Sequence, residues 1–445
     1  MLLRNHTNSV PMQKFSKLTA TSIVIANMVG TGVFTSLGFQ LLGIESHFAL
    51  LMLWLVGGIT ALCGALTYAE LGANLPRSGG EYNFLGRLYH PSAGFISGWV
   101  SATVGFAAPV ALAAMTFGAY LNSAVPELPA TGSALSLVAM LTTVHSFSRQ
   151  ASSGVQQTFT VLKIAVILIF CAAVLIWGNS PQTLSITPQP EDVTVIFSGA
   201  FAVSLIYVNY AYTGWNAVTY VTGELEKPQQ SLPVVLLLGT VTVMLLYLLL
   251  NYTFLASAPT EALRGELEIG VISATSAFGD HAGKLMGVIL ALLLISTVSA
   301  MTMAGPRVLQ MIGQDFRVFN LLSRENSRGI PSVAIIFQSG LAVTFILSST
   351  FESVLIFSSF VLGINTLFSV IGVFILRHKK LGIGGAYKTF GYPWVPLIYL
   401  SVTLWTLSYV LFSRPQEALV GLGLIAVGGI IYQLSMKKQQ DSGRV

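Results

Sequence analysis

The chain has 445 residues, of which 53% are hydrophobic and only 9% are charged, and its mean hydropathy is +0.74. Because soluble domains carry about 25% charged residues, this composition excludes an ordinary soluble domain and indicates an integral membrane protein. The two cysteines, Cys63 and Cys171, both fall in apolar runs, so they predict small buried side chains rather than a disulfide framework or a metal site.

Long apolar runs separated by short polar loops predict an all-α integral membrane protein with twelve transmembrane helices, not a β-barrel, whose strands would alternate. In chain order, the predicted helices lie near residues 17–41, 47–71, 91–122, 131–147, 156–178, 193–222, 232–257, 283–312, 331–350, 353–377, 393–413 and 415–436. Each is near or above the roughly 20 residues that span a bilayer. The acidic segment between the seventh and eighth helices, about 258–282, is predicted to be a solvated loop.

The Lys and Arg residues are distributed unevenly between the two sides of the membrane. An even number of helices places both termini on one side, and that side carries Arg4, Lys14, Lys17, Arg77, Arg87, Arg149, Lys227, Arg307, Arg317, Arg324, Arg328, Arg377, Lys379, Lys380, Lys388, Lys437, Lys438 and Arg444. Only Arg264, Lys284 and Arg414 lie opposite. Positively charged loops stay in the cytoplasm, so we expect a multi-pass protein of the cytoplasmic (inner) membrane with both termini cytoplasmic. The net charge of +5 follows from this asymmetry and does not indicate a nucleic-acid partner.

Two of the predicted helices are interrupted at matching places. The first is broken at Gly30-Thr31-Gly32, and the sixth is broken from Tyr210 to Gly214. A break at membrane depth must line a cavity, because lipid cannot satisfy free backbone N–H and C=O groups. Paired breaks in two halves of a chain indicate the binding site of a secondary transporter. For Gly-Thr-Gly taken alone, a motif for close helix packing is the alternative.

The breaks divide the first ten helices into two sets of five. Five is odd, so the two sets lie in the membrane with opposite orientations, as in a 5+5 inverted repeat with broken helices 1 and 6 and two C-terminal helices added. The predicted parts of the chain are an N-terminal tail (1–16), a first repeat (17–178), a second repeat (193–377), two further helices (393–436) and a C-terminal tail (437–445).

The ends of the broken helices carry partial charges that predict the ligand class. Free amides at Thr31 and Gly32 begin the second half of the first helix and favour an anion. Free carbonyls around Met28, Tyr210 and Thr213 end the other halves and favour a cation. The zwitterionic α-groups of an amino acid fit this pair of sites, which leaves the ligand's side chain to be selected elsewhere.

One charged residue, Lys163, lies inside the fifth predicted helix among apolar neighbours. An ionisable residue within the membrane is a functional hypothesis by default. The alternative is snorkelling, because Lys163 lies roughly 10 Å from the predicted cytoplasmic end and a long side chain can reach the interface from there. The residues alone leave both readings open.

Three segments carry a resemblance to a known family. Residues 68–82, YAELGANLPRSGGEY, resemble the signature loop of the amino acid–polyamine–organocation superfamily. Residues 211–216, AYTGWN, with the following Glu224, Glu226, Lys227 and Pro228, resemble its broken sixth helix, and Gly305-Pro306-Arg307 with Asp315 resembles the end of its eighth. The likeness covers about 17–380, and the Tyr-x-Gly-Trp-Asn pattern is most similar to the L-type amino acid transporter branch and its bacterial relatives.

The resemblance implies a ten-helix repeat core of the bacterial leucine-transporter type and alternating access for an L-amino acid. By motif position, it implies a substrate site made of Met28, Gly30, Thr31, Gly32, Tyr210, Thr213, Gly214, Trp215, Asn216 and Tyr252. Lys163 matches a lysine of sodium-independent relatives, where its ammonium group fills the space of a sodium ion. The resemblance places it between the first helix and the hydroxyl groups of Ser296, Thr297 and Ser299 in the eighth. The segment 123–130 lacks the cysteine that tethers a heavy subunit in animal relatives, so we expect no disulfide-linked heavy subunit.

These observations predict a transporter and not an enzyme. The expected function is sodium-independent exchange of neutral L-amino acids across the lipid bilayer, with no metal and no cofactor. The alternative within this class is proton-coupled symport with Lys163 as the titrating group. A membrane-embedded enzyme and a channel are the rival classes, and the chain shows neither a metal-ligand helix motif nor paired intramembrane aspartates.

Overall fold

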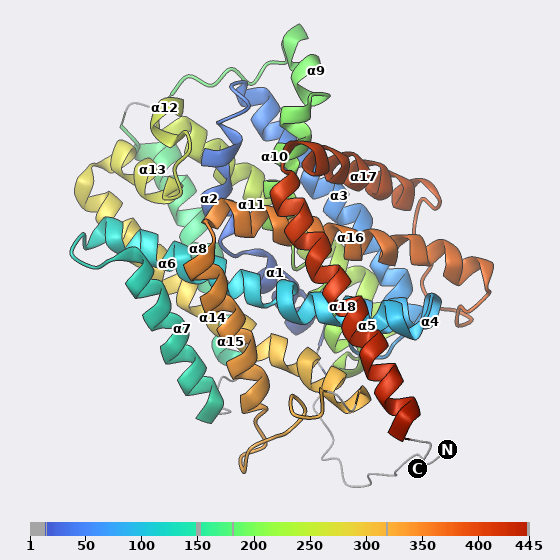
Figure 1. Cartoon of the computed structure of the whole chain (residues 1–445). Coiled ribbons are helices and arrows are strands. Elements are labelled where there is room, and N and C mark those ends of the chain that lie inside the picture. Colours follow the sequence, from blue (N-terminus) through green and yellow to red (C-terminus); the bar gives the residue numbers. More distant parts are fainter. Residues whose placement is uncertain (1–13, 15, 148–152, 180–181, 317–318, 443–445) are drawn as a thin grey trace.

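The computed structural model describes residues 14, 16–147, 153–179, 182–316 and 319–442, and these form an all-helical bundle (Figure 1). Most of the predicted N-terminal tail lies outside the described residues, as do Arg4, Arg149, Arg317 and Arg444. The helices are α1 (Lys17–Met28), α2 (Gly32–Gln40), α3 (His47–Asn74), α4 (Glu81–Leu88), α5 (Pro91–Val100), η1 (Ser101–Gly105), α6 (Ala107–Ala124), α7 (Ala130–Phe147), α8 (Ser153–Trp177), α9 (Pro190–Ile196), α10 (Gly199–Tyr212), η2 (Ala217–Glu224), α11 (Pro228–Ser257), α12 (Thr260–Leu263), α13 (Ile269–Phe278), α14 (Asp280–Asp315), α15 (Ser332–Ser348), α16 (Phe351–His378), α17 (Trp394–Ser413) and α18 (Pro415–Ser442).

The described residues contain ten helical spans that are long and apolar enough to cross a membrane. An eleventh is formed if α9 is joined to the helix that follows it, although the pair is bent by 64°. The ninth predicted helix corresponds to α15, which has only 17 residues and is shorter than the other spans. The structure therefore shows a multi-pass membrane protein with ten to eleven clear spans in the part of the chain that it describes.

Two segments are helical where the sequence predicted no helix. The segment near 258–282, expected as a solvated loop, contains α12 and α13, and α13 packs against α14. It does so because apolar side chains such as Ile269 and Ala277 are spaced to bury one helical face. At the C-terminus, α18 continues to Ser442 and so occupies most of the predicted tail.

Hydroxyl side chains set where several helices begin. The side-chain oxygens of Ser16, Ser46, Ser198 and Thr350 each accept a hydrogen bond from a backbone N–H in the first turn of α1, α3, α10 and α16, respectively. These N-caps satisfy amides that have no partner within the helix. The N-termini of α1 and α10, the first halves of the two interrupted helices, are thus set by the residue directly before each helix.

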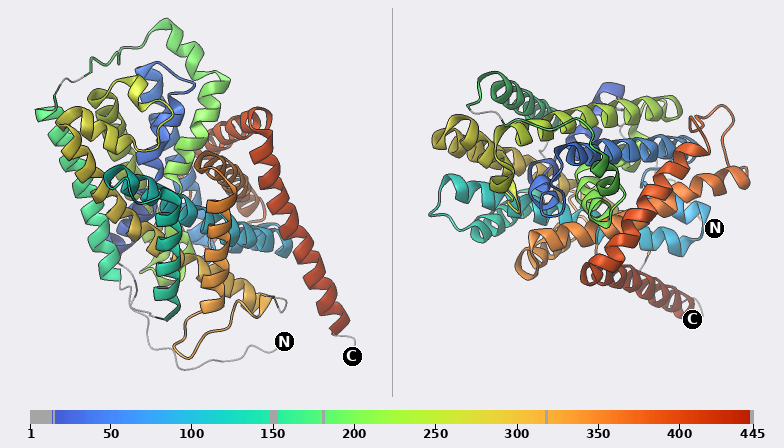
Figure 2. Two further views of the ribbon diagram at one scale, coloured as in Figure 1. Left: turned by 60° about the vertical axis from the view of Figure 1, so that its left-hand side comes forward. Right: turned by 90° about the horizontal axis from the view of Figure 1, so that it is seen from above.

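The bundle is arranged so that the interrupted helices are enclosed by longer ones. α1 packs against α8 and α11, α2 against α10, and α6 runs along α14. α18 lies at the edge of the bundle (Figure 2), and large apolar side chains such as Leu419, Ile430 and Leu434 point outward from it. An apolar outer surface around an enclosed, interrupted centre is the arrangement that a lipid bilayer requires.

Candidate functional site

The two helix breaks cross each other at glycine residues. A Cβ atom added to Gly32 would lie 2.6 Å from the Cα of Ala211, and one added to Gly214 would lie 2.7 Å from the backbone of Asn27. Gly214 also has a φ of +112°, which side chains with a Cβ rarely adopt. Each break therefore carries one glycine that lets it touch the backbone of the other.

Gly30 has a different environment from these two glycines. A Cβ atom added there would meet nothing closer than 3.9 Å, and the residue lines the cavity described below. The alternative reading of Gly-Thr-Gly as a packing motif thus applies to Gly32, whereas Gly30 has room for a Cβ atom and lines the cavity.

The hydroxyl group of Tyr247 in α11 joins the two breaks. It lies 2.5 Å from the carbonyl oxygen of Met28 and 3.0 Å from that of Ala211. Tyr247 is fully buried and packs against Tyr212, with ring centroids 5.0 Å apart. A single hydroxyl can donate only one proton at a time, so these two carbonyls share it and are held close together.

Backbone groups around both breaks are available to a ligand. The first N–H groups of α2, from Thr31 to Val33, precede any helical carbonyl that could accept from them. On the other side, α10 ends at Tyr212, where Thr213 turns to an extended conformation. The carbonyl of Tyr210 already accepts from the amide of Thr213 at 2.9 Å, which leaves it one lone pair. The arrangement can bind an anion at α2 and a cation at α10.

Lys163 of α8 is turned into the bundle and is only 6% exposed. Its ammonium nitrogen donates to the carbonyl of Val29 at 3.2 Å and to the hydroxyl of Thr297 in α14 at 2.8 Å. This places a positive charge directly behind the first break, in contact with α14. The side chain does not extend along the bundle toward an interface, as snorkelling would require.

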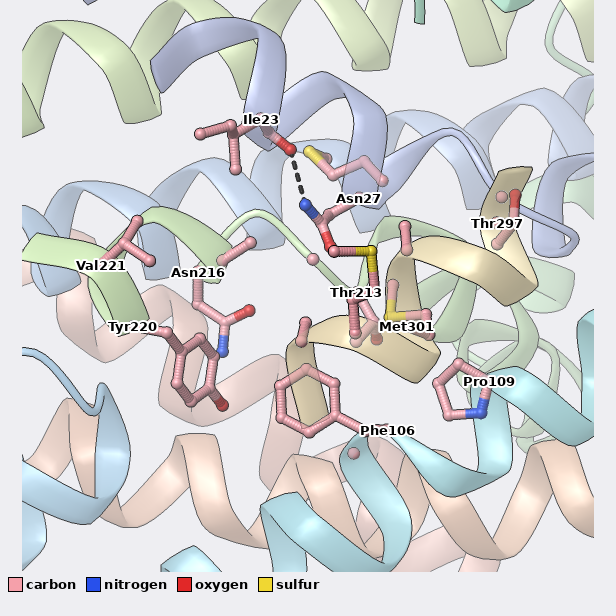
Figure 3. A pocket seen from close by; sticks show the side chains of 18 of the residues that line it. Ile23, Asn27, Phe106, Pro109, Thr213, Asn216, Tyr220, Val221, Thr297 and Met301 are labelled. Atoms are coloured by element: carbon pink, nitrogen blue, oxygen red, sulfur yellow. Dashed lines mark hydrogen bonds between the residues drawn. The ribbon is translucent and has the colours of Figure 1, made fainter. Parts of the chain in front are cut away.

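A cavity of about 340 Å³ lies beside the crossing of the breaks (Figure 3). Its lining residues include Ile23, Asn27, Met28, Gly30, Thr31, Gly32, Phe106, Pro109, Tyr210, Thr213, Gly214, Asn216, Tyr220, Val221, Thr297, Met301 and Arg307. Apolar side chains from α1, α6, α14 and η2, together with Phe106, form most of the wall, with a few polar groups placed between them. A mainly apolar cavity with a few convergent polar groups is typical of a small-molecule site.

The cavity extends toward the end of the bundle where α1 begins, which we call the proximal end. Thr19 and Ser22, in the first turns of α1, line the cavity and are partly exposed, as is Arg307 of α14. Among the described residues of α2, only Gly32 lines it. The cavity is thus continuous with the proximal end and stops at the breaks.

The opposite, distal end is closed by aromatic and polar contacts. Phe39 of α2 stacks between Tyr207 of α10 and Phe351 of α16, with ring centroids 5.6 and 6.0 Å apart. Tyr207 and Arg414 both donate to the same carboxylate oxygen of Glu352, each at 2.6 Å. These contacts fasten the distal halves of both interrupted helices to α16.

A second, smaller cavity of about 70 Å³ lies between α10, α16 and α17. Trp215 faces this smaller cavity and not the larger one, and its ring meets that of Tyr68 edge-on at 4.7 Å. Asn216 lines both cavities, and its side-chain nitrogen lies 2.5 Å from a carboxylate oxygen of Glu81. Asn216 therefore lies in the wall between the two cavities, as do Thr213, Tyr220 and Leu362.

The structure separates the sequence-predicted site residues into two groups. Met28, Gly30, Thr31, Gly32, Tyr210, Thr213, Gly214, Asn216 and Thr297 line the larger cavity. Trp215, Tyr252, Ser296 and Lys163 are not part of its lining. Ser296 instead donates back to the carbonyl of Leu293 at 2.7 Å, because its side chain lies on a different face of α14 from that of Thr297.

Tyr252 lies away from both cavities, and another tyrosine of the same helix contacts the breaks. Tyr247, five residues earlier on α11, reaches both breaks, whereas Tyr252 lines neither cavity. Five residues correspond to about 500° around an α-helix, so the two side chains point in directions roughly 140° apart. α11 contains both Tyr247 and Tyr252, and the packing of α11 against α1 determines that Tyr247 faces the breaks.

Glu81 is a further residue that sequence reasoning placed only in a loop. It is the first residue of α4 and is 1% exposed.

At the proximal end, Tyr82 donates to Asp315 at the end of α14, and Arg77 lies 3.7 Å from the same carboxylate. Burial and the neighbouring Asp315 raise the pKa of Tyr82 well above its usual range, so it stays a neutral donor.

The described side chains include no group of three or more His, Cys, Asp or Glu residues that could hold a metal ion. His145 of α7, which is buried, lies 2.8 Å from the hydroxyl of Ser299. His145 therefore connects α7 to α14 through a hydrogen bond.

Comparison with known proteins agrees with this architecture. The amino acid permease family model matches residues 15–432. The serine/threonine exchanger SteT of Bacillus subtilis is 27% identical over 449 residues, covering 98% of this chain and all of that protein. The mouse b(0,+)-type amino acid transporter 1 is 25% identical and the mouse large neutral amino acids transporter small subunit 2 is 28% identical, covering 93% and 94% of this chain and 86% and 80% of their own lengths. With ten to eleven membrane spans, a paired helix break and this match, the chain belongs to the amino acid permease family of the amino acid–polyamine–organocation superfamily, whose members are transporters and not enzymes.

Proposed function

We propose that this protein is a sodium-independent transporter that exchanges neutral L-amino acids across the membrane by alternating access. The observation that carries the proposal is the crossing of the two helix breaks beside a cavity that is open at one end and closed at the other. A site that opens to each side in turn has this form in either of its end states.

The α-groups of the substrate would be bound by backbone atoms. The carboxylate would meet the N–H groups at the start of α2, near Gly30, Thr31 and Gly32. The α-ammonium group would meet the carbonyls of Tyr210 and Thr213. The carbonyl of Met28 lies beside them but already accepts from the amide of Gly30 and the hydroxyl of Tyr247, so it would contribute only its partial negative charge. All amino acids carry the same α-carboxylate and α-ammonium groups. The rest of the cavity wall would therefore select the substrate by its side chain.

The wall supports a neutral substrate. Apart from Arg307 at the exposed proximal mouth, the described residues that line the cavity carry no charged side chain. A charged substrate side chain would therefore be desolvated there without an ionic partner, which costs several kcal/mol.

Sodium independence is supported by Lys163. Its ammonium group lies between the carbonyl of Val29 and the hydroxyl of Thr297, a pair of oxygens that could otherwise coordinate a cation. A fixed positive charge at this place would link α1 to α14 without a sodium ion. The alternative coupling is proton symport, in which Lys163 itself would lose and regain a proton.

The larger organisation is also part of the proposal. We infer twelve transmembrane helices, with the short α15 as the ninth, arranged as two inverted repeats (17–178 and 193–377) followed by α17 and α18 at 393–436. Both termini would lie in the cytoplasm, so that the proximal end faces inward and the structure represents an inward-open state. The chain would work without a disulfide-linked heavy subunit, as the absence of cysteine in 123–130 suggests.

The experiment is uptake of a radiolabelled neutral amino acid into proteoliposomes, in sodium-free buffer and without a pH gradient. We expect uptake into vesicles preloaded with unlabelled amino acid and little uptake into empty vesicles. Uptake into empty vesicles that an imposed proton gradient accelerates would replace exchange with symport. No uptake of any amino acid under either condition would contradict the proposed function.

A further inference from the structure

The polar groups of the larger cavity are oriented by contacts outside it. Asn27 and Asn216 stand on different walls, as Figure 3 shows, and each has its amide nitrogen bound elsewhere. The nitrogen of Asn27 donates to the carbonyl of Ile23 at 2.8 Å, one turn back in α1. The nitrogen of Asn216 donates to Glu81 at 2.5 Å. In both residues the amide oxygen is left for the cavity.

The contact with Glu81 determines which way the Asn216 amide faces. A carboxylate can only accept hydrogen bonds, whereas an amide group has a donating and an accepting side. Asn216 must therefore present its NH₂ group to Glu81 and its oxygen in the opposite direction. In Figure 3 that oxygen is turned toward the interior of the cavity.

Glu81 is buried, and hydrogen bonds reach one of its two carboxylate oxygens while the other has no partner. It is 1% exposed, and the same carboxylate oxygen that meets Asn216 also accepts from the hydroxyl of Tyr68 in α3 at 3.0 Å. None of the ion pairs among the described residues involves Glu81. A buried carboxylate without a cation depends on its hydrogen-bond donors, so the donor group of Asn216 is strongly required on that side.

Thr213 adds a second acceptor to the cavity lining that contains Asn216. The hydroxyl of Thr213 donates back to the carbonyl of Asn209 at 3.0 Å and so also presents lone pairs to the cavity. Beside these acceptors lie apolar surfaces from Phe106, Val221 and Met301. The complement of such a wall is a side chain that combines apolar atoms with one hydrogen-bond donor.

We propose that Glu81 is a positioning residue for substrate selection: it holds the Asn216 amide so that the carbonyl oxygen faces the cavity and favours neutral amino acids whose side chain donates a hydrogen bond, such as hydroxyl amino acids. This inference rests on the proposed function, because it concerns the side chain of a transported amino acid. Glu81 acts through Asn216 and does not touch the substrate.

The test uses threonine and valine, which have nearly the same shape and differ in one hydroxyl group. KM is measured for both in proteoliposomes that contain the full chain. We expect a KM for threonine about tenfold below that for valine, which corresponds to one hydrogen bond of ordinary strength. Asn216→Ala should bring the two KM values to within about twofold, mainly by raising that for threonine.

The variants of Glu81 separate positioning from folding. Glu81→Gln keeps the shape but offers both a donor and an acceptor, so the Asn216 amide is free to turn and the threonine preference should fall to about threefold or less. Glu81→Asp keeps an acceptor-only carboxylate and should retain more of the preference than Glu81→Gln. The double variant Glu81→Gln/Asn216→Ala should have the same ratio of KM values as Asn216→Ala alone. The reason is that Glu81 acts on the substrate only through the Asn216 amide, which this variant lacks.

Tyr68→Phe is the matched control, since it removes one hydrogen bond to the same carboxylate oxygen and leaves the pairing of Glu81 with Asn216 in place. It should keep the wild-type ratio of KM values. Equal KM values for threonine and valine in the wild-type protein would overturn the inference while leaving amino acid transport intact. An unchanged ratio in Glu81→Gln, with the ratio lost in Asn216→Ala, would overturn the role of Glu81. Absence of any amino acid transport by the wild-type protein would overturn the proposed function as well.

Discussion

At the scale of single residues, the three glycines of the two breaks have separate physical roles. Gly32 and Gly214 allow one backbone to touch another, whereas Gly30 leaves space beside Thr297. The same residue type therefore serves packing at two positions and ligand access at the third.

This difference predicts that two substitutions differ in their effect on stability. Gly30→Val should fill the cavity and abolish uptake while the melting temperature stays within a few degrees of wild type. Gly32→Ala should lower the melting temperature as well, because its Cβ would lie 2.6 Å from Ala211 and overpacking costs about 1–3 kcal/mol. The measurements are uptake and thermal unfolding of the purified protein. Gly340→Ala, which meets nothing within 4 Å, is the control, and wild-type uptake by Gly30→Val would refute the site.

Lys163 gives the second prediction at this scale. Lys163→Met keeps the length of the side chain and removes the donor to Val29 and Thr297. We expect turnover to fall at least tenfold, since α1 and α14 lose the charge that connects them, with the protein still inserted in the membrane. Initial rates of exchange measure the effect. Lys284→Met, on the exposed surface of α14, should exchange at the wild-type rate, and equal rates for both variants would leave Lys163 without a role in transport.

At the scale of elements, the distal closure joins α2, α10 and α16. It combines a stack of three aromatic rings with the contacts of Tyr207 and Arg414 to one oxygen of Glu352. The segment that contains α12 adds to it, because Gly265 donates to the carbonyl of Gly38 at 2.8 Å. Opening at this end must therefore separate α2 and α10 from α16.

Glu352→Gln is expected to weaken this closure. Hydrogen bonds to a charged group contribute about 1.5–3 kcal/mol, so the population open at the distal end should rise about tenfold or more. Hydrogen–deuterium exchange of the amides in α2 should become faster, with little change in α14. Glu45→Gln is the matched control, because Glu45 also pairs with an arginine, Arg264, but its side chain is 83% exposed and such pairs contribute little. Equal exchange in the two variants would mean that the aromatic stack alone holds the end closed.

At the scale of the whole molecule, the cavity is open at the proximal end and the distal end is sealed. If the termini are cytoplasmic, a membrane-impermeant maleimide should label Ser22→Cys from the cytoplasmic face only. Leu42→Cys, at the distal end of the bundle and 57% exposed, should be labelled only from the opposite face. A background without Cys63 and Cys171 is used, and both are buried in the wild-type protein.

Substrate should act differently on the two positions. An amino acid bound beside the breaks should slow the labelling of Ser22→Cys, which lines the cavity, and leave the rate at Leu42→Cys unchanged. Labelling of Ser22→Cys from the outer face would reverse the proposed orientation.

Much of this architecture follows from the sequence by itself. Hydropathy determined the membrane class and most helix positions, because a bilayer requires about 20 apolar residues for every span. The two breaks were also readable, since Gly-Thr-Gly and the Thr-Gly pair at 213–214 interrupt otherwise continuous apolar runs. The inward position of Lys163 followed only from the family resemblance, because the residues alone left snorkelling open.

Only the tertiary structure decided which side chains meet. Tyr247 rather than Tyr252 reaches the breaks, Trp215 faces away from the larger cavity, and Glu81 is buried against Asn216. These outcomes depend on how each helix is rotated about its axis and on which neighbours it packs against. A membrane helix that is apolar all around carries no periodic signal for that rotation, so packing between distant parts of the chain had to determine it.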